Sequence, residues 1–156
     1  MKKNSFYIII ILLSALLTSC SWQEYFVINN TSETSIQITY TLDTSLCGFC
    51  LFSEPPRAYK TDKEFDIDWE KPININDADS SITSVSFSVP PHTAVIIGTL
   101  SNDHYTSYNQ YFINSRKFNL QTLSIISKED TTIILPETFD RFFVKEEGFI
   151  TLKIKN

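Results

Sequence analysis

The feature that most constrains the fold is an alternation of apolar and polar side chains with a period of two. In the segment 36–42, Ile36, Ile38 and Tyr40 alternate with glutamine and threonine. The same alternation recurs in the segments 84–89 and 150–155. Successive side chains of a β-strand point to opposite faces, so each segment places one face on a core and the other in water.

Other segments are also typical of strands. Residues 25–29 and 131–135 are β-branched and aromatic, and residues 94–100 and 120–126 are more uniformly apolar, as in central strands. Turn-forming residues separate these runs: Asn29-Asn30-Thr31-Ser32, Pro90-Pro91 and Lys128-Glu129-Asp130. We therefore predict an all-β fold, an antiparallel β-sandwich of about seven strands with at most one or two short helical turns. In general terms the first two strands and their turn resemble immunoglobulin-like modules.

Two segments fit more than one element. Residues 136–143 can form a short helix, with Pro136 at its first position and phenylalanines on one face. Alternatively, residues 142–145 form a strand that pairs with the last strand across a Glu-Glu-Gly turn. We favour the strand, preceded by a single helical turn. Residues 101–117 fit either a short helix or a long loop.

Size and composition limit the class of protein. A chain of 156 residues with 42% hydrophobic and 13% aromatic residues can form one compact domain rather than a disordered segment. The 13 basic residues are outnumbered by 18 acidic ones, and this net negative charge argues against nucleic-acid binding. Only three glycines are present, too few for a glycine-rich phosphate loop.

The first twenty residues have the organisation of an export signal. Lys2 and Lys3 precede an apolar run, Phe6–Leu17, that is interrupted only by Ser14. As a helix this run is about 18 Å long, whereas the hydrocarbon core of a bilayer is about 30 Å thick. The run is therefore too short for a transmembrane helix and is typical of the hydrophobic region of a secretory signal.

The end of this segment, Leu17-Thr18-Ser19-Cys20, resembles the lipobox of bacterial lipoproteins. The resemblance implies that residues 1–19 are a signal peptide removed before Cys20, and that Cys20 receives a diacylglyceryl group and an acyl chain on its new amine. This covalent lipid is the only cofactor that we expect. Residues 20–24 then form a lipidated N-terminus with a short tether, and residues 25–156 form one domain.

The same resemblance predicts a location in the cell envelope. Ser21 stands where lipoproteins kept in the inner membrane often carry aspartate, which favours the outer membrane. Two acyl chains hold a protein stably on a bilayer, so the partner implied for residue 20 is the bilayer itself. The alternative is a secreted protein in which this cysteine falls after the signal by coincidence.

The pair Cys47-Gly48-Phe49-Cys50 has three interpretations. We favour a small disulfide that stiffens a loop in an oxidising compartment. A redox dithiol is less favoured, because prolines soon after the pair prevent the helix that activates such thiols. A zinc site needs two further ligands, for which the sequence offers only His92 and His104.

An acidic stretch, Glu64–Glu70, alternates strictly with Phe65, Ile67 and Trp69. We interpret it as an edge strand whose charges prevent association between sheets. Carboxylates in and after this stretch are weak candidates for calcium ligands, although the EF-hand pattern is missing, and we predict no metal site. These candidates are Asp66, Asp68, Asp77 and Asp79.

A tyrosine-rich segment, 102–112, has the composition of a recognition loop. Tyr105, Tyr108 and Tyr111 would contact a protein or glycan ligand in this interpretation. The competing interpretation, that the tyrosines only cover the edge of a sheet, is slightly favoured.

No arrangement of residues singles out catalytic groups, so we predict a protein that is not an enzyme. The chain broadly resembles small envelope lipoproteins of Bacteroidetes, many of which have no assigned role. The expected function is therefore a membrane-anchored binding or scaffolding module. One alternative is an envelope thiol-redox or metal-binding protein that uses Cys47 and Cys50. A second alternative is an inhibitor or accessory subunit of an envelope enzyme or complex.

Overall fold

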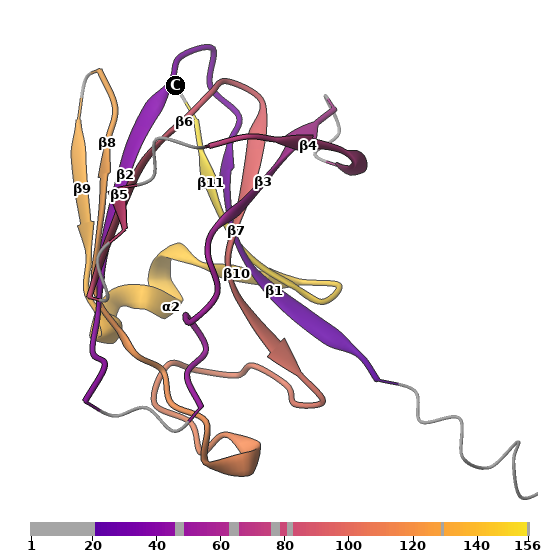
Figure 1. The fold of residues 1–156 in the computed structure, drawn as a ribbon, viewed down its shortest axis with the longest axis vertical. Coiled ribbons are helices and arrows are strands. Elements are labelled where there is room, and N and C mark those ends of the chain that lie inside the picture. Colours follow the sequence, from indigo (N-terminus) through magenta and orange to yellow (C-terminus); the bar gives the residue numbers. More distant parts are fainter. Residues whose placement is uncertain are drawn as a thin grey trace, which may run out of the picture.

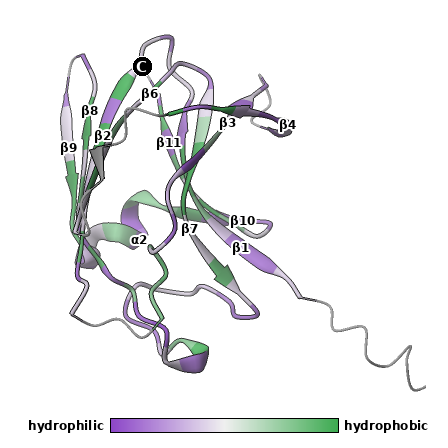
Figure 2. Cartoon of the chain, in the orientation of Figure 1, coloured by the Kyte–Doolittle hydropathy of each residue, from purple (hydrophilic) through white to green (hydrophobic). Residues whose placement is uncertain are grey.

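The chain forms two β-sheets that face each other, with one short helix at one end of the space between them (Figure 1). The computed structural model describes residues 21–45, 49–62, 66–75, 79–80, 83–128 and 130–155. The predicted all-β class is confirmed. In Figure 2 the long strand β7 (Thr93–Ser101) is mostly hydrophobic, whereas β4 (Ile67–Ile73) at the sheet edge is mostly hydrophilic.

The larger sheet, sheet A, has six strands in the order β10-β11-β1-β7-β3-β4. Besides β4 and β7, its strands are β1 Gln23–Asn30, β3 Arg57–Thr61, β10 Val144–Glu146 and β11 Phe149–Ile154. All neighbouring strands run antiparallel except β1 and β11, which are parallel, with Tyr25 opposite Phe149.

The second sheet, sheet B, has five strands in the order β5-β6-β2-β8-β9, and all its pairs are antiparallel. The strands are β2 Ile36–Leu42, β5 Asp79–Ser80, β6 Ser84–Val89, β8 Leu120–Ile126 and β9 Thr131–Ile134. The helical segments are η1 Ile113–Ser115, η2 Pro136–Thr138 and α2 Phe139–Phe142.

The described residues contain more strands than the seven or so predicted. The segments with clear alternation are strands, as expected, and the additional ones are short or polar. Strand β5 has only two residues. Strand β3 has one fully buried residue, Ala58. Such segments lack the alternation of a half-buried strand, which is why the sequence did not reveal them.

The ambiguous segment 136–146 contains both predicted elements. A helical region runs from Pro136 to Phe142, which is longer than the single turn predicted, and β10 then pairs with β11. Glu147 and Gly148 form the connecting turn with φ values of 45° and 85°, a conformation that glycine adopts without strain. The other ambiguous segment, 101–117, is a long loop with one short 3-10 turn, η1.

The main core lies between the two sheets. Phe26 of β1 and Phe52 of the β2–β3 connection are almost fully buried, with ring centroids 5.1 Å apart. Helix α2 inserts Phe139 beside them. Gly98 in β7 permits the close approach of the β2–β3 connection, because a Cβ atom there would lie 2.8 Å from the Phe52 ring and 2.9 Å from the Leu51 carbonyl oxygen.

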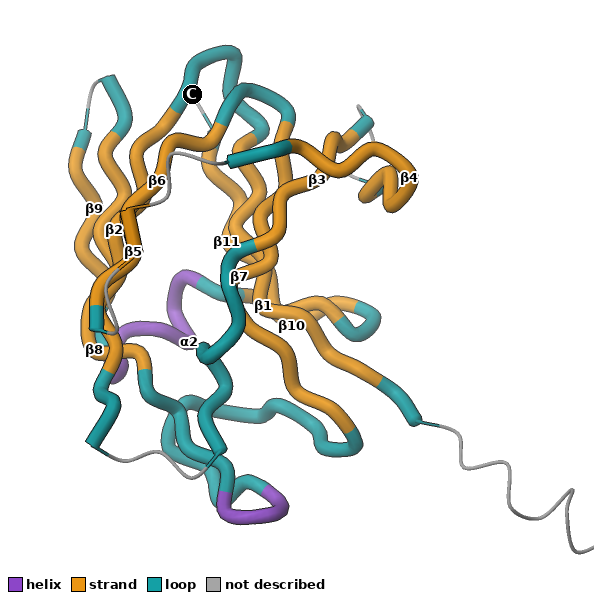
Figure 3. Tube along the Cα trace, viewed as in Figure 1, coloured by secondary structure: helices purple, strands orange, loops and turns teal. Residues whose placement is uncertain are grey.

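Loops gather at the two ends of the sandwich (Figure 3). The lower end, in the orientation of Figure 1, contains the start of β1 and the long β7–β8 loop. The upper end contains the β1–β2 and β6–β7 turns and the end of β11. Strand β1 begins at Gln23, two residues before the domain start that we predict at residue 25. Within the described residues, no helix has the length and apolar character needed to cross a membrane.

Candidate binding groove on sheet A

The outer face of sheet A carries a second, smaller apolar cluster. Odd-numbered residues of β1 point away from the main core, because side chains alternate along a strand. Val27 is therefore buried against Ala94 and Ile96 of β7, on the side of the sheet opposite to Phe26. Partly buried side chains pack around this cluster: Tyr25, Tyr59, Ile67 and Phe149.

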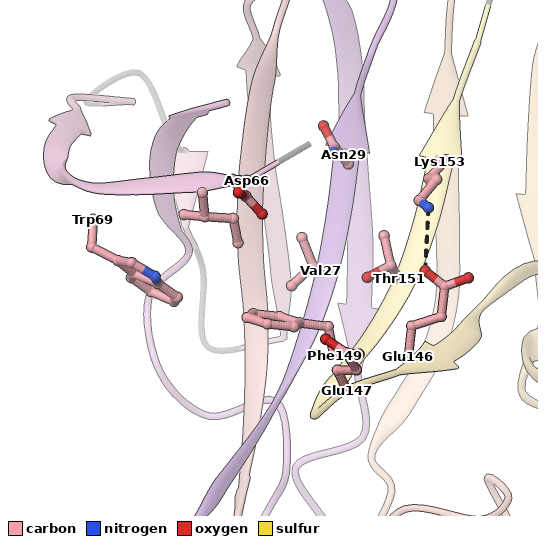
Figure 4. Close-up of a pocket in the computed structure, with 10 residues that line it drawn as sticks. Val27, Asn29, Asp66, Trp69, Glu146, Glu147, Phe149, Thr151 and Lys153 are labelled. Carbon is pink, nitrogen blue, oxygen red and sulfur yellow. Dashed lines mark hydrogen bonds and ion pairs between the residues drawn. The ribbon is translucent and has the colours of Figure 1, made fainter. Parts of the chain in front are cut away.

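A groove of about 770 Å³ lies over this face (Figure 4). Its volume is in the range of ligand-binding pockets. Strands β1, β4 and β11 and the β10–β11 turn all contribute to its walls. The lining residues that matter for its chemistry are Val27, Asn29, Asp66, Trp69, Glu146 and Phe149.

Aromatic rings form one wall of the groove. Trp69 projects from edge strand β4 and keeps 47% of its surface exposed. Its ring lies 6.4 Å from that of Phe149, with an interplanar angle of 28°, and 5.5 Å from that of Tyr25. Tyr59 supports Trp69 from β3, at a ring separation of 5.2 Å. Trp69 therefore has a fixed position and still presents ring surface to solvent.

Carboxylates dominate the polar groups of the groove. Asp66, Glu146 and Glu147 line it, and Lys153 is its one cation among the described lining residues. The Lys153 Nζ lies 3.3 Å from a carboxylate oxygen of Glu146, as the dashed line in Figure 4 shows. The groove is therefore rich in hydrogen-bond acceptors and carries net negative charge.

The most informative polar atom is the side-chain oxygen of Asn29. Asn29 lines the groove, only 3% of its surface is exposed, and its Oδ1 has no hydrogen-bond partner among the described residues. A buried polar atom without a partner costs roughly 1–3 kcal/mol, and such atoms are rare in folded proteins. One wall of the groove thus contains an acceptor that is covered by neighbouring atoms and has no partner among the described residues.

The three tyrosines of the tyrosine-rich loop lie in different surroundings. Tyr105 is buried in the main core, and its hydroxyl donates a hydrogen bond of 2.5 Å to Asp140. Burial and the Asp140 carboxylate raise the pKa of the Tyr105 hydroxyl. Tyr108 is half-buried against Phe118, and only Tyr111 is exposed. The less favoured interpretation, in which all three tyrosines contact a ligand, does not fit Tyr105, which is a core residue.

The two histidines lie at opposite ends of the sandwich. His92 Nε2 lies 3.2 Å from Glu33 in the turns at the upper end, and His104 Nδ1 lies 2.9 Å from Glu24 at the lower end. The nine residues of β7 separate them, which is about 30 Å. They therefore cannot both ligate one zinc ion. Cys47 lies outside the described residues, so the Cys47–Cys50 disulfide stays a prediction.

The acidic candidates are spread over both sheets. Asp66 lines the groove beside β4, and Asp79 belongs to β5 of sheet B. Strand β4 lies at a sheet edge as predicted, but it ends at Ile73 and not at Glu70, and Trp69, which the alternation places on a buried face, is exposed. Asp68 pairs with Lys71, and the hydrogen bond from Lys71 lowers the pKa of the Asp68 carboxyl. Asp77 lies outside the described residues. Within the described part, no three His, Cys, Asp or Glu side chains are grouped as metal ligands.

No protein-family model, curated protein or solved structure significantly matches this chain. The groove itself was missed by the sequence reasoning. Its residues come from strands that are distant in the sequence, and the pairing of β1 with β11 is what brings Val27 and Phe149 onto one face. The one usable signal was Trp69, an aromatic residue on a predicted edge strand.

Proposed function

We propose that the protein is a lipid-anchored module of the bacterial envelope that binds glycans in the groove on sheet A without catalysing a reaction. The observation that carries the proposal is the combination of an exposed, supported Trp69 ring with the unpartnered buried oxygen of Asn29 in one groove.

The lipid anchor is supported by the sequence. The order of basic residues, apolar run and Leu17-Thr18-Ser19-Cys20 is that of a lipoprotein signal, and Ser21 favours the outer membrane. Strand β1 begins at Gln23, so a lipid on Cys20 would hold the sandwich directly at the bilayer. The two antiparallel-rich sheets are consistent with the immunoglobulin-like arrangement that we retain as part of the proposal.

The chemistry of the groove favours a glycan over an anionic ligand. Sugar rings have apolar faces that pack on aromatic side chains and hydroxyl groups that donate hydrogen bonds. Trp69 offers the aromatic surface, whereas Asn29 and Asp66 offer acceptors. The excess of carboxylates repels phosphate groups and other anions. A protein ligand that inserts a donor side chain is the alternative that a binding experiment separates.

The Cys47–Cys50 disulfide is a structural part of this proposal. The backbone of Cys50 forms a bridge to Lys117, which joins the β2–β3 connection to the β7–β8 loop. A disulfide there would stiffen the lower end and would have no redox role.

Calorimetric titration of the full lipoprotein in detergent with cellohexaose, maltohexaose and N-acetylchitohexaose tests the proposal. We expect saturable binding of at least one of these glycans, and a loss of affinity of about tenfold or more in Trp69→Ala, equivalent to about 1.4 kcal/mol. Asn29→Leu removes the acceptor and should weaken the same interaction.

Trp22→Ala is a matched control, because Trp22 is as exposed as Trp69 but lies outside the groove. Its affinity should equal that of the wild type. Equal binding by wild type and Trp69→Ala, or no saturable heat with any of the three glycans, would contradict glycan binding in the groove.

A further inference from the structure

The lower end of the sandwich presents a set of exposed apolar side chains, which we call the lower apolar surface. It consists of Trp22, Phe49, Tyr111 and Ile113, with exposed fractions of 45%, 68%, 88% and 50%. The residues come from three separate segments: the residue before β1, the β2–β3 connection and the β7–β8 loop. These side chains lie at the same end of the domain and are candidates for contact with an apolar partner.

The backbone holds this surface in place. The Trp22 carbonyl accepts a hydrogen bond of 3.0 Å from the Asn102 N–H, and its ring lies 3.8 Å from the His104 ring. The Phe49 carbonyl accepts one of 3.0 Å from the Lys117 N–H. The Ile113 N–H donates to the buried carboxylate of Asp103 at 2.7 Å.

Cationic side chains lie beside the lower apolar surface. Lys117 is exposed next to Phe49, and Arg116 follows the turn that contains Ile113. Arg116 donates a hydrogen bond to the Ser101 carbonyl, which keeps its side chain at this end. Asp103, an acidic residue of the β7–β8 loop, is buried, and its carboxylate accepts hydrogen bonds from the N–H groups of His104 and Ile113. The exposed charges around Phe49 are mixed, because Lys117 and Arg116 lie there together with Glu54, whose side chain is 58% exposed.

We infer that the lower end lies against the bilayer, with the lower apolar surface inserted at the lipid–water interface. The inference rests on the proposed lipid anchor. Trp22 is two residues from Cys20, so at most about 7 Å of chain separates it from the acylated residue. Tryptophan and tyrosine are the side chains that favour membrane interfaces. Lys117 and Arg116 lie where they contact anionic headgroups.

This arrangement assigns an orientation to the whole domain. The lower end contacts lipid, and the upper end points away from the membrane. The outer face of sheet A then lies on the side of the domain, next to the end that contacts lipid. Tyr25, which contacts the Trp69 ring, lies three residues beyond Trp22, or about 10 Å further along β1. The β10–β11 turn, which bounds the groove, lies beside Gln23, so the groove opens just beyond the end that contacts lipid.

The two tryptophans of the chain provide an internal comparison. Trp69→Phe leaves Trp22 as the only tryptophan, and Trp22→Phe leaves Trp69. Each full-length lipoprotein is reconstituted into vesicles of phosphatidylethanolamine and phosphatidylglycerol, with or without brominated acyl chains that quench tryptophan emission. We expect quenching of Trp22 to be at least about twofold stronger than that of Trp69, as interfacial depth requires.

The outcomes separate this inference from the proposed anchor. A protein that floats with the vesicles and shows strong quenching of Trp22 supports both. A protein that floats with the vesicles, but in which Trp22 is quenched no more than Trp69, overturns the contact between the lower end and the bilayer and leaves the lipid anchor supported. A protein that does not float and carries no acyl group overturns the anchor, and the contact between the lower end and the bilayer with it.

A second pair of variants tests the apolar side chains directly. Phe49→Asp combined with Ile113→Asp introduces charge into the lower apolar surface. We expect it to reduce the quenching of Trp22 about twofold or more without changing thermal stability, because both residues are exposed. Ile133→Asp, at a 60% exposed residue of β9, is the matched control and should leave quenching unchanged. Equal quenching in both variants would overturn the inference.

Discussion

Each end of β1 closes one end of the main core with a buried polar side chain, but one of these side chains is charged and the other is neutral. Four residues of this strand point inward, and the two in the middle, Phe26 and Ile28, belong to the main core. The outer two, Glu24 and Asn30, are polar and buried, with 5% and 0% of their surfaces exposed. Each closes one end of the core by binding groups from loops that are far away in the sequence.

At the lower end the closing residue is charged. The Glu24 carboxylate lies 2.7 Å from Lys145 Nζ and 2.9 Å from His104 Nδ1, and it accepts a hydrogen bond of 2.8 Å from the Tyr105 N–H. Burial raises the pKa of Glu24, but the hydrogen bonds from His104, Lys145 and the Tyr105 backbone outweigh it and leave the pKa below its ordinary value of 4.5.

At the upper end the closing residue is neutral. The Asn30 amide nitrogen lies 2.9 Å, 3.2 Å and 2.9 Å from the carbonyl oxygens of Thr34, Val89 and Pro90. Its side-chain oxygen accepts hydrogen bonds from the Ser32 N–H and hydroxyl. A single amide thus joins the β1–β2 turn to the end of β6.

The hydrogen bonds at the two ends of β1 differ in how they depend on pH. Asn30 does not titrate, so the upper end keeps its hydrogen bonds at any moderate pH. Glu24 binds as a carboxylate, and its contribution is lost once it is protonated. The lower end is therefore the acid-sensitive end of the domain.

The largest expected effect is at the upper end. Asn30→Ala removes the donor for three carbonyl groups and the acceptor for Ser32, so we expect a loss of about 3 kcal/mol in the free energy of unfolding. Chemical denaturation followed by circular dichroism measures it. A loss below about 1 kcal/mol would show that water replaces these hydrogen bonds without cost and would contradict the role of Asn30.

The second prediction concerns Glu24. At neutral pH, Glu24→Gln should cost about 2 kcal/mol, because Lys145 and His104 lose a charged partner in a buried site. The pKa is lowered on folding, so this contribution is complete above about pH 4.5 and disappears as the pH falls through the lower folded value.

Denaturation of wild type and Glu24→Gln at a series of pH values checks the sign. The gap in stability between them should narrow below about pH 4.5, whereas the gap between wild type and Asn30→Ala should stay constant. A Glu24→Gln gap that widens with acid would contradict the assignment of a lowered pKa.

The smallest effect is expected for a surface pair at the upper end. His92 and Glu33 are 3.2 Å apart, but their side chains are 51% and 79% exposed. His92→Ala should change the free energy of unfolding by less than about 0.5 kcal/mol, because solvent screens exposed ion pairs. A loss approaching that of Asn30→Ala would mean that the turns, and not the buried amide, hold this end together.

The sequence predicted the strands that have one buried and one solvated face. The outer face of sheet B shows why: Gln37, Thr39 and Ser86 bond to one another across β2 and β6, so polar residues alternate cleanly with core residues. In sheet A the signal was of another kind. Both faces of β1 and β7 are buried, so alternation is absent, and these two strands were predicted from their β-branched, aromatic and apolar residues instead. Strand β3 has neither signal and was not predicted.

The candidate site was less predictable than the fold. Asn29 and Asn30 were predicted to be turn residues, but they are the last two residues of β1. Asn29 faces the groove, and Asn30 faces the core. Glu24 was predicted to belong to the short tether, because its partners Lys145 and His104 are far away in the sequence. Local composition carries no information about such contacts, since the sheet pairings alone create them.

The parallel pairing of β1 with β11 has a consequence for how the domain assembles. β1 lies between β7 and β11, and nearly the whole described chain separates it from β11. Of the described strands, β1 is therefore synthesised first and acquires its neighbour β11 after the others are available. Contacts of this range slow folding, and until they form one edge of an apolar strand stays open to other chains. Completion of the C-terminal strand is thus the step that ends the period of greatest aggregation risk.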